Sequence, residues 1–279
     1  MQNSINLTPH LYNYGIDELA YYDQGKGEQT ILLIHGFGED HAIWKNQIEF
    51  LSTHYRVIAP NLPGVHCKPL ALHHSQAPNI RMYVEVLHEL MHHLHIEQYY
   101  IVGHSMGGYI GLSFADYYVN HVQGLLLFHS TTYEDNEAKK TSRMKVAEFI
   151  QEWGVSKYLE TATPNLFGDA FKKTNSGVIQ NVIESGLGIS QEAMIQFVFA
   201  MRNRKAMTHL LQQHTIPVWM IAGEADLAVT IQDSLEQIKL LPSSNSLVLK
   251  EVGHMGMLEA TDLVNQFIKK MLVGDKDAL

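Results

Sequence analysis

Residues 98–110 read QYYIVGHSMGGYI, and within them Gly103-His104-Ser105-Met106-Gly107 matches the pattern G-x-S-x-G. The apolar run before this pattern predicts a strand and the stretch after it predicts a helix, so Ser105 falls on the turn between the two. The backbone is strained at so sharp a turn, and the flanking glycines avoid the clashes that Cβ atoms would make. The turn also places the amide of Met106 at a helix N-terminus, where negative charge is stabilised. The pattern therefore predicts that Ser105 is a nucleophile.

A second loop complements this turn. The run TILLIH, residues 30–35, predicts a strand buried on both faces, and it stops at Gly36-Phe37-Gly38. Acyl transfer develops negative charge on the former carbonyl oxygen, and N–H donors stabilise that charge. We expect the amide of Phe37 to be one donor and the amide of Met106 to be the other. A strand-ending turn without such a role is the alternative interpretation of these glycines.

A nucleophilic serine needs a general base and an acid that orients the base. His254 lies in VGHM, residues 252–255, between the last expected strand and the last expected helix. Asp226 lies in AGEAD, residues 222–226, just after the run IPVWMIA. The order Ser105, Asp226, His254 is one of the orders in which such triads occur, so we expect Asp226 to hold His254. Three other acids compete for this role: Glu134, Asp135 and Glu224.

Short apolar runs alternate with longer amphipathic stretches, which predicts an α/β fold with a mostly parallel sheet flanked by helices. From 132 to 214 the pattern changes to helical segments without a clear buried strand. We therefore expect a core domain over 1–131 and 215–279 and a helical cap over 132–214, since long insertions usually carry function. The expected strands are 11–23 (two short ones around Gly15), 30–35, 55–59, 98–102, 122–128, 216–222 and 246–250, and the expected core helices are 42–51, 81–95, 107–118 and 256–271.

Composition excludes several classes of protein. Of the 279 residues 46% are hydrophobic and 18% are charged, which is enough apolar material for one large core. The net charge of −9 argues against a nucleic-acid binder and against docking on anionic membranes. Residues 1–14 lack the pattern of a signal peptide and no apolar run approaches the ~18 residues that span a bilayer, so a cytoplasmic location is expected. The single cysteine, Cys67, forms no intramolecular disulfide.

His88-Glu89-Leu90-Met91-His92 matches H-E-x-x-H, a zinc-protease pattern, on a predicted helix. His88, His92 and His95 share one face of that helix. A catalytic zinc needs a third protein ligand and an open position, and no later residue stands in a context that nominates it. We therefore interpret the pattern as part of a solvated helix that covers the flank of the sheet, and we expect no metal and no organic cofactor. Sensitivity to a chelator separates the two interpretations.

Four segments resemble the α/β-hydrolase superfamily: LLIHGFGED, GHSMGGYIG, PVWMIAGEAD and EVGHMGMLE. The resemblance covers almost the full length of the chain and is specific at the level of the superfamily. It implies that Ser105, Asp226 and His254 form a catalytic triad. It also implies that the amides of Phe37 and Met106 form the oxyanion hole.

Two loops of this resemblance bear on the choice of substrate. The run HGFGEDHAIW, residues 35–44, resembles the esterase and signalling-receptor branches more than the lipases with an HGGG loop. Relatives commonly carry D-x-P-G-x-G-x-S after the second parallel strand, where this chain has Asn61-Leu62-Pro63-Gly64-Val65-His66-Cys67. The aspartate and the second glycine are missing, which leaves the triad intact but changes the loop beside it. Substrate preference is therefore not carried over from relatives.

These features predict a serine hydrolase of the carboxylesterase type that cleaves an ester-like bond of a small molecule through an acyl-enzyme. The same triad is compatible with thioesters, lactones, C–C diketones and cofactor-free peroxidase chemistry, and the superfamily also includes ligand receptors with slow turnover. Nucleic acids and membranes are not expected partners. Side chains expected to contact the substrate are Phe37, Tyr133, Phe149, Trp153 and Met255. Helix-period apolar residues such as Phe149 and Trp153 are alternatively the insertion's own core.

Overall fold

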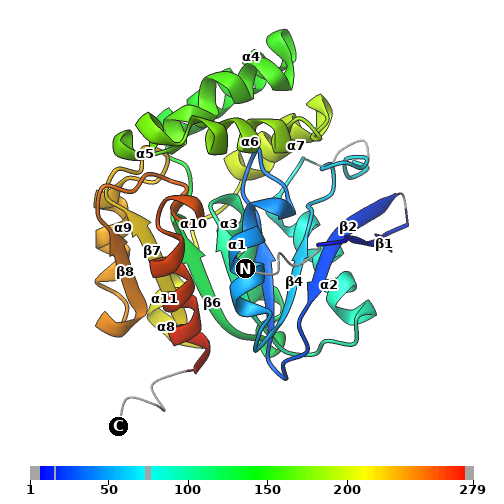
Figure 1. Ribbon diagram of the computed structural model, residues 1–279. Coiled ribbons are helices and arrows are strands. Elements are labelled where there is room, and N and C mark those ends of the chain that lie inside the picture. The colour runs from blue at the N-terminus through cyan, green and yellow to red at the C-terminus, as the bar shows by residue number, and fades with distance from the viewer. Residues whose placement is uncertain (1–6, 16, 73–76, 274–279) are drawn as a thin grey trace.

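The computed structural model describes residues 7–15, 17–72 and 77–273, which contain a sheet of eight strands in the order β1-β2-β4-β3-β5-β6-β7-β8 (Figure 1). β1 and β2 pair antiparallel with their neighbours, whereas the pairs from β4 to β8 are parallel. The α/β fold predicted from the alternating apolar runs is therefore confirmed. The strands are β1 (His10–Asn13), β2 (Glu18–Gln24), β3 (Thr30–Ile34), β4 (Arg56–Pro60), β5 (Tyr99–His104), β6 (Val122–Phe128), β7 (Val218–Gly223) and β8 (Ser246–Leu249).

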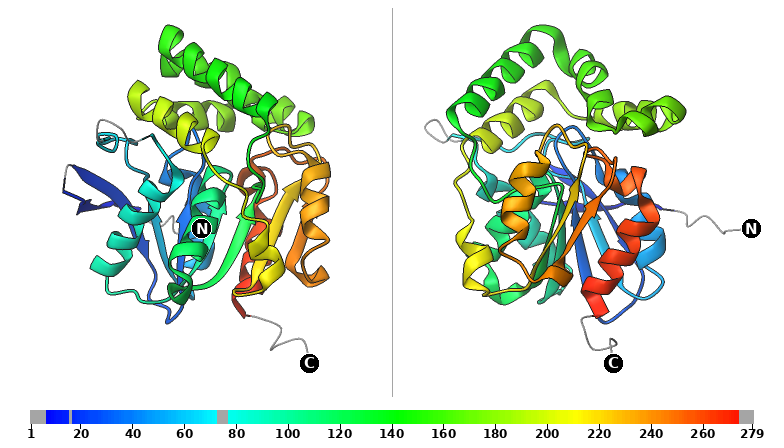
Figure 2. Two further views of the ribbon diagram at one scale, coloured as in Figure 1. Left: turned by 180° about the vertical axis from the view of Figure 1, so that it is seen from behind. Right: turned by 90° about the vertical axis from the view of Figure 1, so that its left-hand side faces the viewer.

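The central strands are buried because helices cover both faces of the sheet. All five residues of β3 are buried, as its unbroken apolar sequence predicts. α1 (Lys45–Leu51) and α11 (Thr261–Val273) lie on one face (Figure 2). α2 (Ile80–His93), α3 (Met106–Tyr117) and α9 (Ile231–Ile238) lie on the other face.

The register of the parallel strands aligns their carboxyl ends at one edge of the sheet. Ile34 of β3 pairs with Gly103 of β5, and Gly103 pairs with Leu127 of β6. Phe128 at the end of β6 in turn pairs with Ile221 of β7. The loops that follow these strands therefore meet at one edge, which is where sheets of this kind bind their ligands.

Above this edge lies a second layer of helices, at the top of Figure 1. It contains α4 (Glu137–Ala162), α5 (Asp169–Thr174), α6 (Ser176–Gly186) and α7 (Gln191–Arg202). α4 consists of two helical segments that meet at Gly154 and diverge in Figure 2. Gly154 has a φ of 79° and a ψ of 171°, a conformation that favours glycine, so this residue sets the bend.

Three elements differ from those expected. α8 (His209–Gln213), within the insertion expected over 132–214, packs beside α3 in the core layer (Figure 2). The last helix is split into α10 (Gly256–Glu259) and α11, because Ala260 has a non-helical φ of −138°. α9 is absent from the expected elements, although Thr230 caps its N-terminus. Short 3₁₀ turns complete the structure: η1 (His41–Trp44), η2 (Val119–His121), η3 (Thr163–Leu166) and η4 (Ser243–Asn245).

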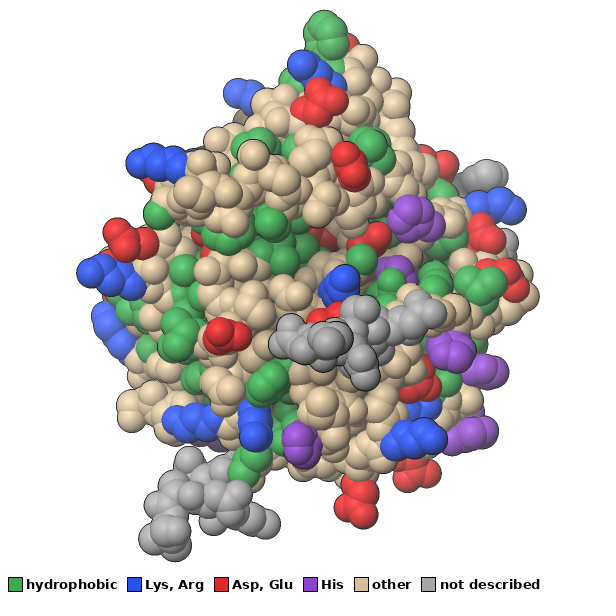
Figure 3. Space-filling model, in the orientation of Figure 1, with side chains coloured by type: hydrophobic (Ala, Val, Ile, Leu, Met, Phe, Trp, Pro, Cys, Tyr) green, Lys and Arg blue, Asp and Glu red, His purple; other side chains and the backbone are tan. Residues whose placement is uncertain are grey.

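The seam between the two layers is partly open. A cavity of about 250 Å³ lies there between η1, α1 and α6. Hydrophobic side chains gather in this seam in Figure 3, whereas acidic and basic side chains are interspersed over the rest of the face shown. Among the described helices, none combines the length and the apolar character needed to cross a membrane.

Candidate active site

Ser105 lies on the turn between β5 and α3, where the sequence pattern places it. Its φ of 50° and ψ of −110° are strained for a residue other than glycine. The flanking glycines permit this turn. A Cβ atom on Gly103 would lie 2.3 Å from the carbonyl oxygen of Gly107, and one on Gly107 would lie 2.2 Å from that of Ile34. The Ser105 amide also donates to the carbonyl oxygen of Phe128 at 2.9 Å, which ties the turn to the sheet.

His254 and Asp226 meet beside this turn. His254 Nδ1 lies 2.7 Å from Asp226 Oδ2, and both side chains are buried. The other carboxylate oxygen accepts hydrogen bonds from the amides of Ala228 (2.8 Å) and Val229 (3.0 Å). Burial by itself raises the pKa of Asp226, but the rings of His254 and His129 hold that pKa well below its ordinary value. An ionised carboxylate only accepts hydrogen bonds, so Nδ1 of His254 carries the proton and Nε2 is left as a base.

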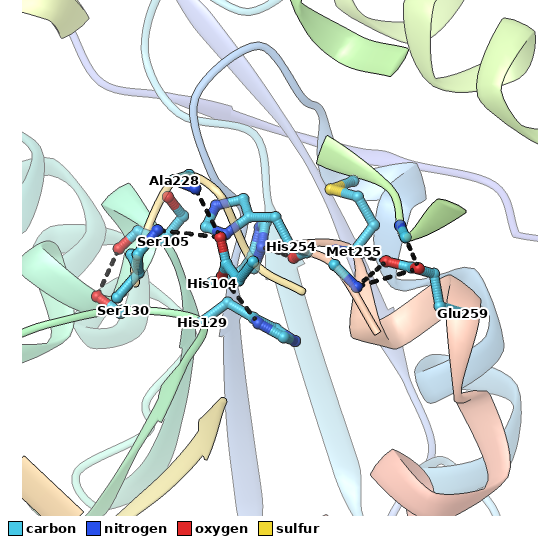
Figure 4. A network of polar contacts seen from close by, with 12 residues as sticks. His104, Ser105, His129, Ser130, Ala228, His254, Met255 and Glu259 are labelled. Atoms are coloured by element: carbon cyan, nitrogen blue, oxygen red, sulfur yellow. Dashed lines mark hydrogen bonds and ion pairs between the residues drawn. The ribbon is translucent and has the colours of Figure 1, made fainter. Parts of the chain in front are cut away.

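A second histidine, which the sequence did not single out, shares the same carboxylate. His129 Nδ1 lies 3.2 Å from Asp226 Oδ2, so two rings converge on one oxygen (Figure 4). Burial lowers the pKa of His129 to about 4, although the neighbouring carboxylate opposes the shift. The ring is therefore neutral at pH 7 and donates from Nδ1. Its only signal in the sequence is its position directly after β6, at the edge where the loops meet.

A buried ion pair supports the backbone at His254. His104 Nδ1 lies 3.0 Å from a carboxylate oxygen of Glu39, and His104 Nε2 lies 2.9 Å from the carbonyl oxygen of His254. Both partners are acceptors, so a doubly protonated His104 satisfies both contacts. Burial disfavours the two charges, but their mutual attraction prevails and raises the pKa of His104 while it lowers the pKa of Glu39. Glu39 also accepts from the Gly36 amide at 2.8 Å, so the pair joins the loops after β3, β5 and β8.

Glu259 of α10 fastens the His254 loop to the upper helices. Its carboxylate accepts from the amides of Gly168 (2.8 Å), Gly253 (3.1 Å) and Met255 (3.2 Å), as Figure 4 shows in part. Gly168 directly precedes α5, so one side chain bridges the two layers. The loop that positions His254 is therefore held by His104 at the His254 carbonyl oxygen and by Glu259 at the amides of Gly253 and Met255.

Ser105 and His254 line one cavity of about 240 Å³ between the sheet edge and the upper helices. Phe37 lines it from the loop after β3, and the first half of α4 supplies two basic side chains. Its wall is therefore partly apolar and partly cationic. The other lining residues are Glu39, Tyr109, Lys139, Ser142, Arg143, Val146, Tyr158, Leu159, Ala162, Thr163, Leu166, Met201, Leu227, Ala228 and Val229.

The remaining side chains expected to contact a substrate lie outside this lining. Tyr133 lines a neighbouring cavity of about 330 Å³, and Met255 is fully buried. Phe149 packs against Tyr158, with ring centroids 6.3 Å apart. Trp153, next to the bend of α4, is 59% exposed. For Phe149 and Trp153 the expectation rested on helical periodicity, which shows which residues share a face but not which face turns toward the cavity.

A family model described as alpha/beta hydrolase fold matches residues 29–181, which is more than half of the chain. The chain belongs to the α/β-hydrolase fold family. The matched region begins just before β3 and includes the turn that carries Ser105. Asp226 and His254 lie beyond it, and in this α/β-hydrolase the strand order β5-β6-β7-β8 brings the loops that carry them to the same sheet edge as the Ser105 turn.

Proteins similar to this α/β-hydrolase act on different bonds. The dihydrolipoyllysine-residue acetyltransferase component of an acetoin cleaving system from Pseudomonas putida is 28% identical over 87% of the chain, which spans only 63% of that protein. The (E)-2-((N-methylformamido)methylene)succinate hydrolase of Acinetobacter baylyi is 25% identical over 98% of the chain and 97% of its own length. The structure of a thermophilic esterase from Thermogutta terrifontis, with malate bound, is 27% identical and has a TM-score of 0.84 over 95% of this chain and 98% of that one.

The two amides expected to stabilise an oxyanion belong to adjacent loops of the α/β-hydrolase. Met106 is the first residue of α3, and the first four N–H groups of a helix have no partner within it. Phe37 follows β3, and the register of Ile34 with Gly103 sets its loop beside the Ser105 turn. The ring of Phe37 also makes an edge contact with Tyr158 of α4, with centroids 5.7 Å apart.

The loop over residues 61–67 has a residue with positive φ at the position where relatives commonly carry the second glycine. His66 stands where the resemblance places the second glycine, and its φ is 56°. Its amide donates to the carbonyl oxygen of Gly188 at 2.8 Å, which ties the loop to the upper helices. Asn61, in place of the aspartate, is buried and accepts from the His41 amide at 2.9 Å. The substitutions therefore leave the loop folded against the helical layer.

Two sets of histidines bear on metal binding. Ligand atoms of His129, Asp226 and His254 lie within 4.8 Å of one another. Hydrogen bonding accounts for this convergence, because Nδ1 of both rings contacts the same carboxylate oxygen. His88 of the H-E-x-x-H pattern instead stacks on Tyr118, with ring centroids 3.8 Å apart. Within residues 7–15, 17–72 and 77–273, His88 belongs to no group of three ligand side chains that converges in this way.

Replacing Glu39 by glutamine is expected to lower the free energy of unfolding by about 3 kcal/mol, because the buried charge on His104 loses its partner. Urea unfolding of both proteins at pH 5.5 measures the difference. Glu148, an exposed residue of α4, provides the matched control. Glu148→Gln is expected to change the free energy by less than about 0.5 kcal/mol.

The effect of Glu39→Gln has a defined pH dependence. The lowered pKa of Glu39 gives a contribution that is present above its ordinary value of 4.5 and is lost as the pH falls through the lowered value. The raised pKa of His104 gives a contribution that is present below its ordinary value of 6.5 and is lost as the pH rises through the raised value. The stability difference is therefore largest between these two ordinary values. A difference that does not change with pH would contradict the ion pair.

Proposed function

We propose that this α/β-hydrolase cleaves an ester-like bond of a small molecule through an acyl-enzyme on Ser105, beneath a cap formed by α4 to α7 within residues 132–214. One observation carries the proposal: His254 Nδ1 lies 2.7 Å from the buried Asp226 carboxylate, beside a serine on a strained turn over the same cavity. The carboxylate fixes the proton on Nδ1 and leaves Nε2 as the base. This arrangement is suited to activate a hydroxyl group rather than to bind a ligand passively.

In the proposed mechanism Ser105 Oγ attacks the carbonyl carbon while His254 Nε2 takes its proton. Negative charge then forms on the carbonyl oxygen, next to the amides of Phe37 and Met106. The intermediate expels the alcohol, which takes the proton from His254 and leaves the acyl group on Ser105. Water gives a proton to His254 and attacks this acyl group, and Oγ leaves with the returned proton. One ester and one water thus become one acid and one alcohol.

The size and wall of the cavity favour a short acyl group. Its volume is about 240 Å³, and its apolar wall includes Leu159, Leu166 and Met201. Each methylene buried against such a wall contributes about 0.8 kcal/mol until the cavity is full. Further methylenes lie in the mouth or in solvent and contribute less. The preferred acyl chain is therefore short.

A panel of 4-nitrophenyl esters from acetate to laurate tests this proposal. We expect kcat/KM to be highest for a short chain and to fall at least about tenfold by laurate, because each misplaced methylene forfeits its burial energy. Release of 4-nitrophenol is followed with and without a chelator, which is expected to have no effect. A correctly folded protein that hydrolyses none of these esters would contradict the proposal.

Cleavage of another bond by the same residues is the second candidate. It is favoured by the similarity, over nearly the full length, to the (E)-2-((N-methylformamido)methylene)succinate hydrolase of Acinetobacter baylyi. The attack of Ser105 on a carbonyl carbon also serves an amide or a β-diketone whose leaving group is stable enough. An ethyl ester, an anilide and a β-diketone with the same acyl group separate the candidates. The ester proposal predicts the highest kcat/KM for the ethyl ester.

A further inference from the structure

One face of α4 brings two cations to the cavity that Ser105 and His254 line. Lys139, Ser142, Arg143 and Val146 all contribute to its wall. Their spacing of three, four and seven residues places them on the same side of the helix. The mechanism proposed above uses neither of the two basic side chains.

The positive charge on this face is only partly neutralised. Arg143 Nε lies 3.1 Å from Asp135, but Arg204 lies 2.8 Å from the same carboxylate, so two guanidinium groups share one negative charge. Lys139 Nζ donates to the uncharged carbonyl oxygen of Ala228 at 3.0 Å. Lys139 has no ion-pair partner among the residues that the structure describes.

The acids near the cavity are already engaged. Among the lining residues that the structure describes, Glu39 is the only acid, and it lies 3.0 Å from His104 in the buried ion pair. Asp226 is not part of the lining and accepts hydrogen bonds from both His254 and His129. The α4 face therefore gives the cavity positive charge that Glu39, already paired with His104, does not cancel.

The position of these cations in α4 strengthens the effect. The side chain of Asn136 caps the helix by accepting from the Lys139 amide at 2.9 Å, so Lys139 and Arg143 lie in its first two turns. The N-terminus of a helix carries partial positive charge, and basic residues there are unfavourable unless an anion binds. Asp135 and Ala228 hold the two side chains in place, which lowers the entropy that binding would cost.

We propose that Lys139 and Arg143 bind a carboxylate of the substrate, so that the substrate is an ester-like derivative of an organic acid with a second, free carboxylate. This inference rests on the proposed function, because it assigns the far end of the molecule whose carbonyl carbon Ser105 attacks. Only Nε of Arg143 is hydrogen-bonded within the described part of the chain, and Arg143 lines the cavity, so its two terminal nitrogens are available to a ligand. A planar carboxylate matches that guanidinium fork, and Lys139 adds a point charge.

The test compares two esters that differ only at the far end, mono-4-nitrophenyl adipate and 4-nitrophenyl hexanoate. Wild-type protein is expected to favour the adipate in kcat/KM by about tenfold or more, since a charge-assisted contact contributes about 1.5–3 kcal/mol. Lys139→Gln is expected to remove most of this preference through a higher KM for the adipate. Lys145→Gln, at an exposed position of the same helix, is the matched control and is expected to leave both rates unchanged.

Two further variants separate recognition from folding. Arg143→Gln leaves Asp135 with one partner and therefore risks unfolding, whereas Arg143→Lys keeps the charge and is expected to retain part of the preference. Calorimetric titration with adipate and with inorganic phosphate measures binding without turnover. Tighter binding of adipate than of phosphate supports the carboxylate site if Lys139→Gln weakens the binding of adipate about tenfold. This result supports the site even if the protein hydrolyses no ester. The absence of ester hydrolysis would contradict only the proposed function. Equal use of both esters, equal binding by the variant, or tighter binding of phosphate overturns the inference.

Discussion

Ser105→Ala is expected to reduce kcat for the preferred ester by at least about 10³-fold, with the protein still folded. The substitution removes the only atom that forms the acyl-enzyme in the proposed mechanism. Loss of a nucleophile leaves the residual acceleration that comes from the oxyanion hole and from binding alone. Steady-state rates of 4-nitrophenol release from wild-type and variant protein measure the effect.

The matched control is Ser113→Ala, a buried serine of α3 outside the cavity that Ser105 lines. It is expected to keep kcat within a factor of about three of wild type. Circular dichroism and the urea midpoint of each variant show that both are folded. Equal rates for Ser105→Ala and wild type would show that another group carries the reaction.

Asp226→Asn is expected to reduce kcat by about 10⁴-fold, because the amide no longer fixes the proton on His254 Nδ1. An asparagine also leaves the imidazolium that forms during attack without a counter-charge. The amides of Ala228 and Val229 donate hydrogen bonds to Oδ1 of Asp226, and the oxygen of an asparagine can still accept both of them. The loss is therefore expected in kcat, with little change in the fold.

Glu224→Gln is the matched control for Asp226→Asn, because Glu224 is the competing acid two residues away. Its side chain is exposed, and it accepts from the Glu251 amide at 3.2 Å. Near wild-type rates are expected for this variant. A larger loss in Glu224→Gln than in Asp226→Asn would show that Glu224, and not Asp226, orients His254, which would contradict our assignment.

The sequence predicts the strands and the placement of Ser105, Asp226 and His254 because these features depend on local pattern and on strand order. Apolar runs identify buried strands, and the carboxyl ends of parallel strands must meet at one edge. The fold class is confirmed on this basis. The roles of the three residues follow from the order of their loops and stay predictions until the variants are measured.

The supporting contacts are not visible in the sequence because they join residues far apart along the chain. His104 and Glu39 are separated by 65 residues, His129 and Asp226 by 97, and Glu259 and Gly168 by 91. No periodic pattern in the sequence connects residues so far apart. The sequence therefore does not distinguish a buried histidine that has an acidic partner from the other histidines of the chain. These pairs required the three-dimensional structure.

The sequence also did not predict which face of α4 turns toward the cavity. The expected contact Trp153 is largely exposed, whereas Lys139 and Arg143 line the cavity. Apolar periodicity assigns apolar residues to the buried side, so it passes over a wall built from cations. The bend at Gly154 further changes the direction of the helix between the two groups.

Labelling with a fluorophosphonate probe tests the activated serine most directly. Intact-mass and peptide analysis of wild-type protein, with and without a chelator, shows how many adducts form and where. Our account predicts one adduct per chain, on Ser105, that is absent from Ser105→Ala and insensitive to the chelator. A folded wild-type protein that forms no adduct, or one that is labelled at another residue, would contradict the account.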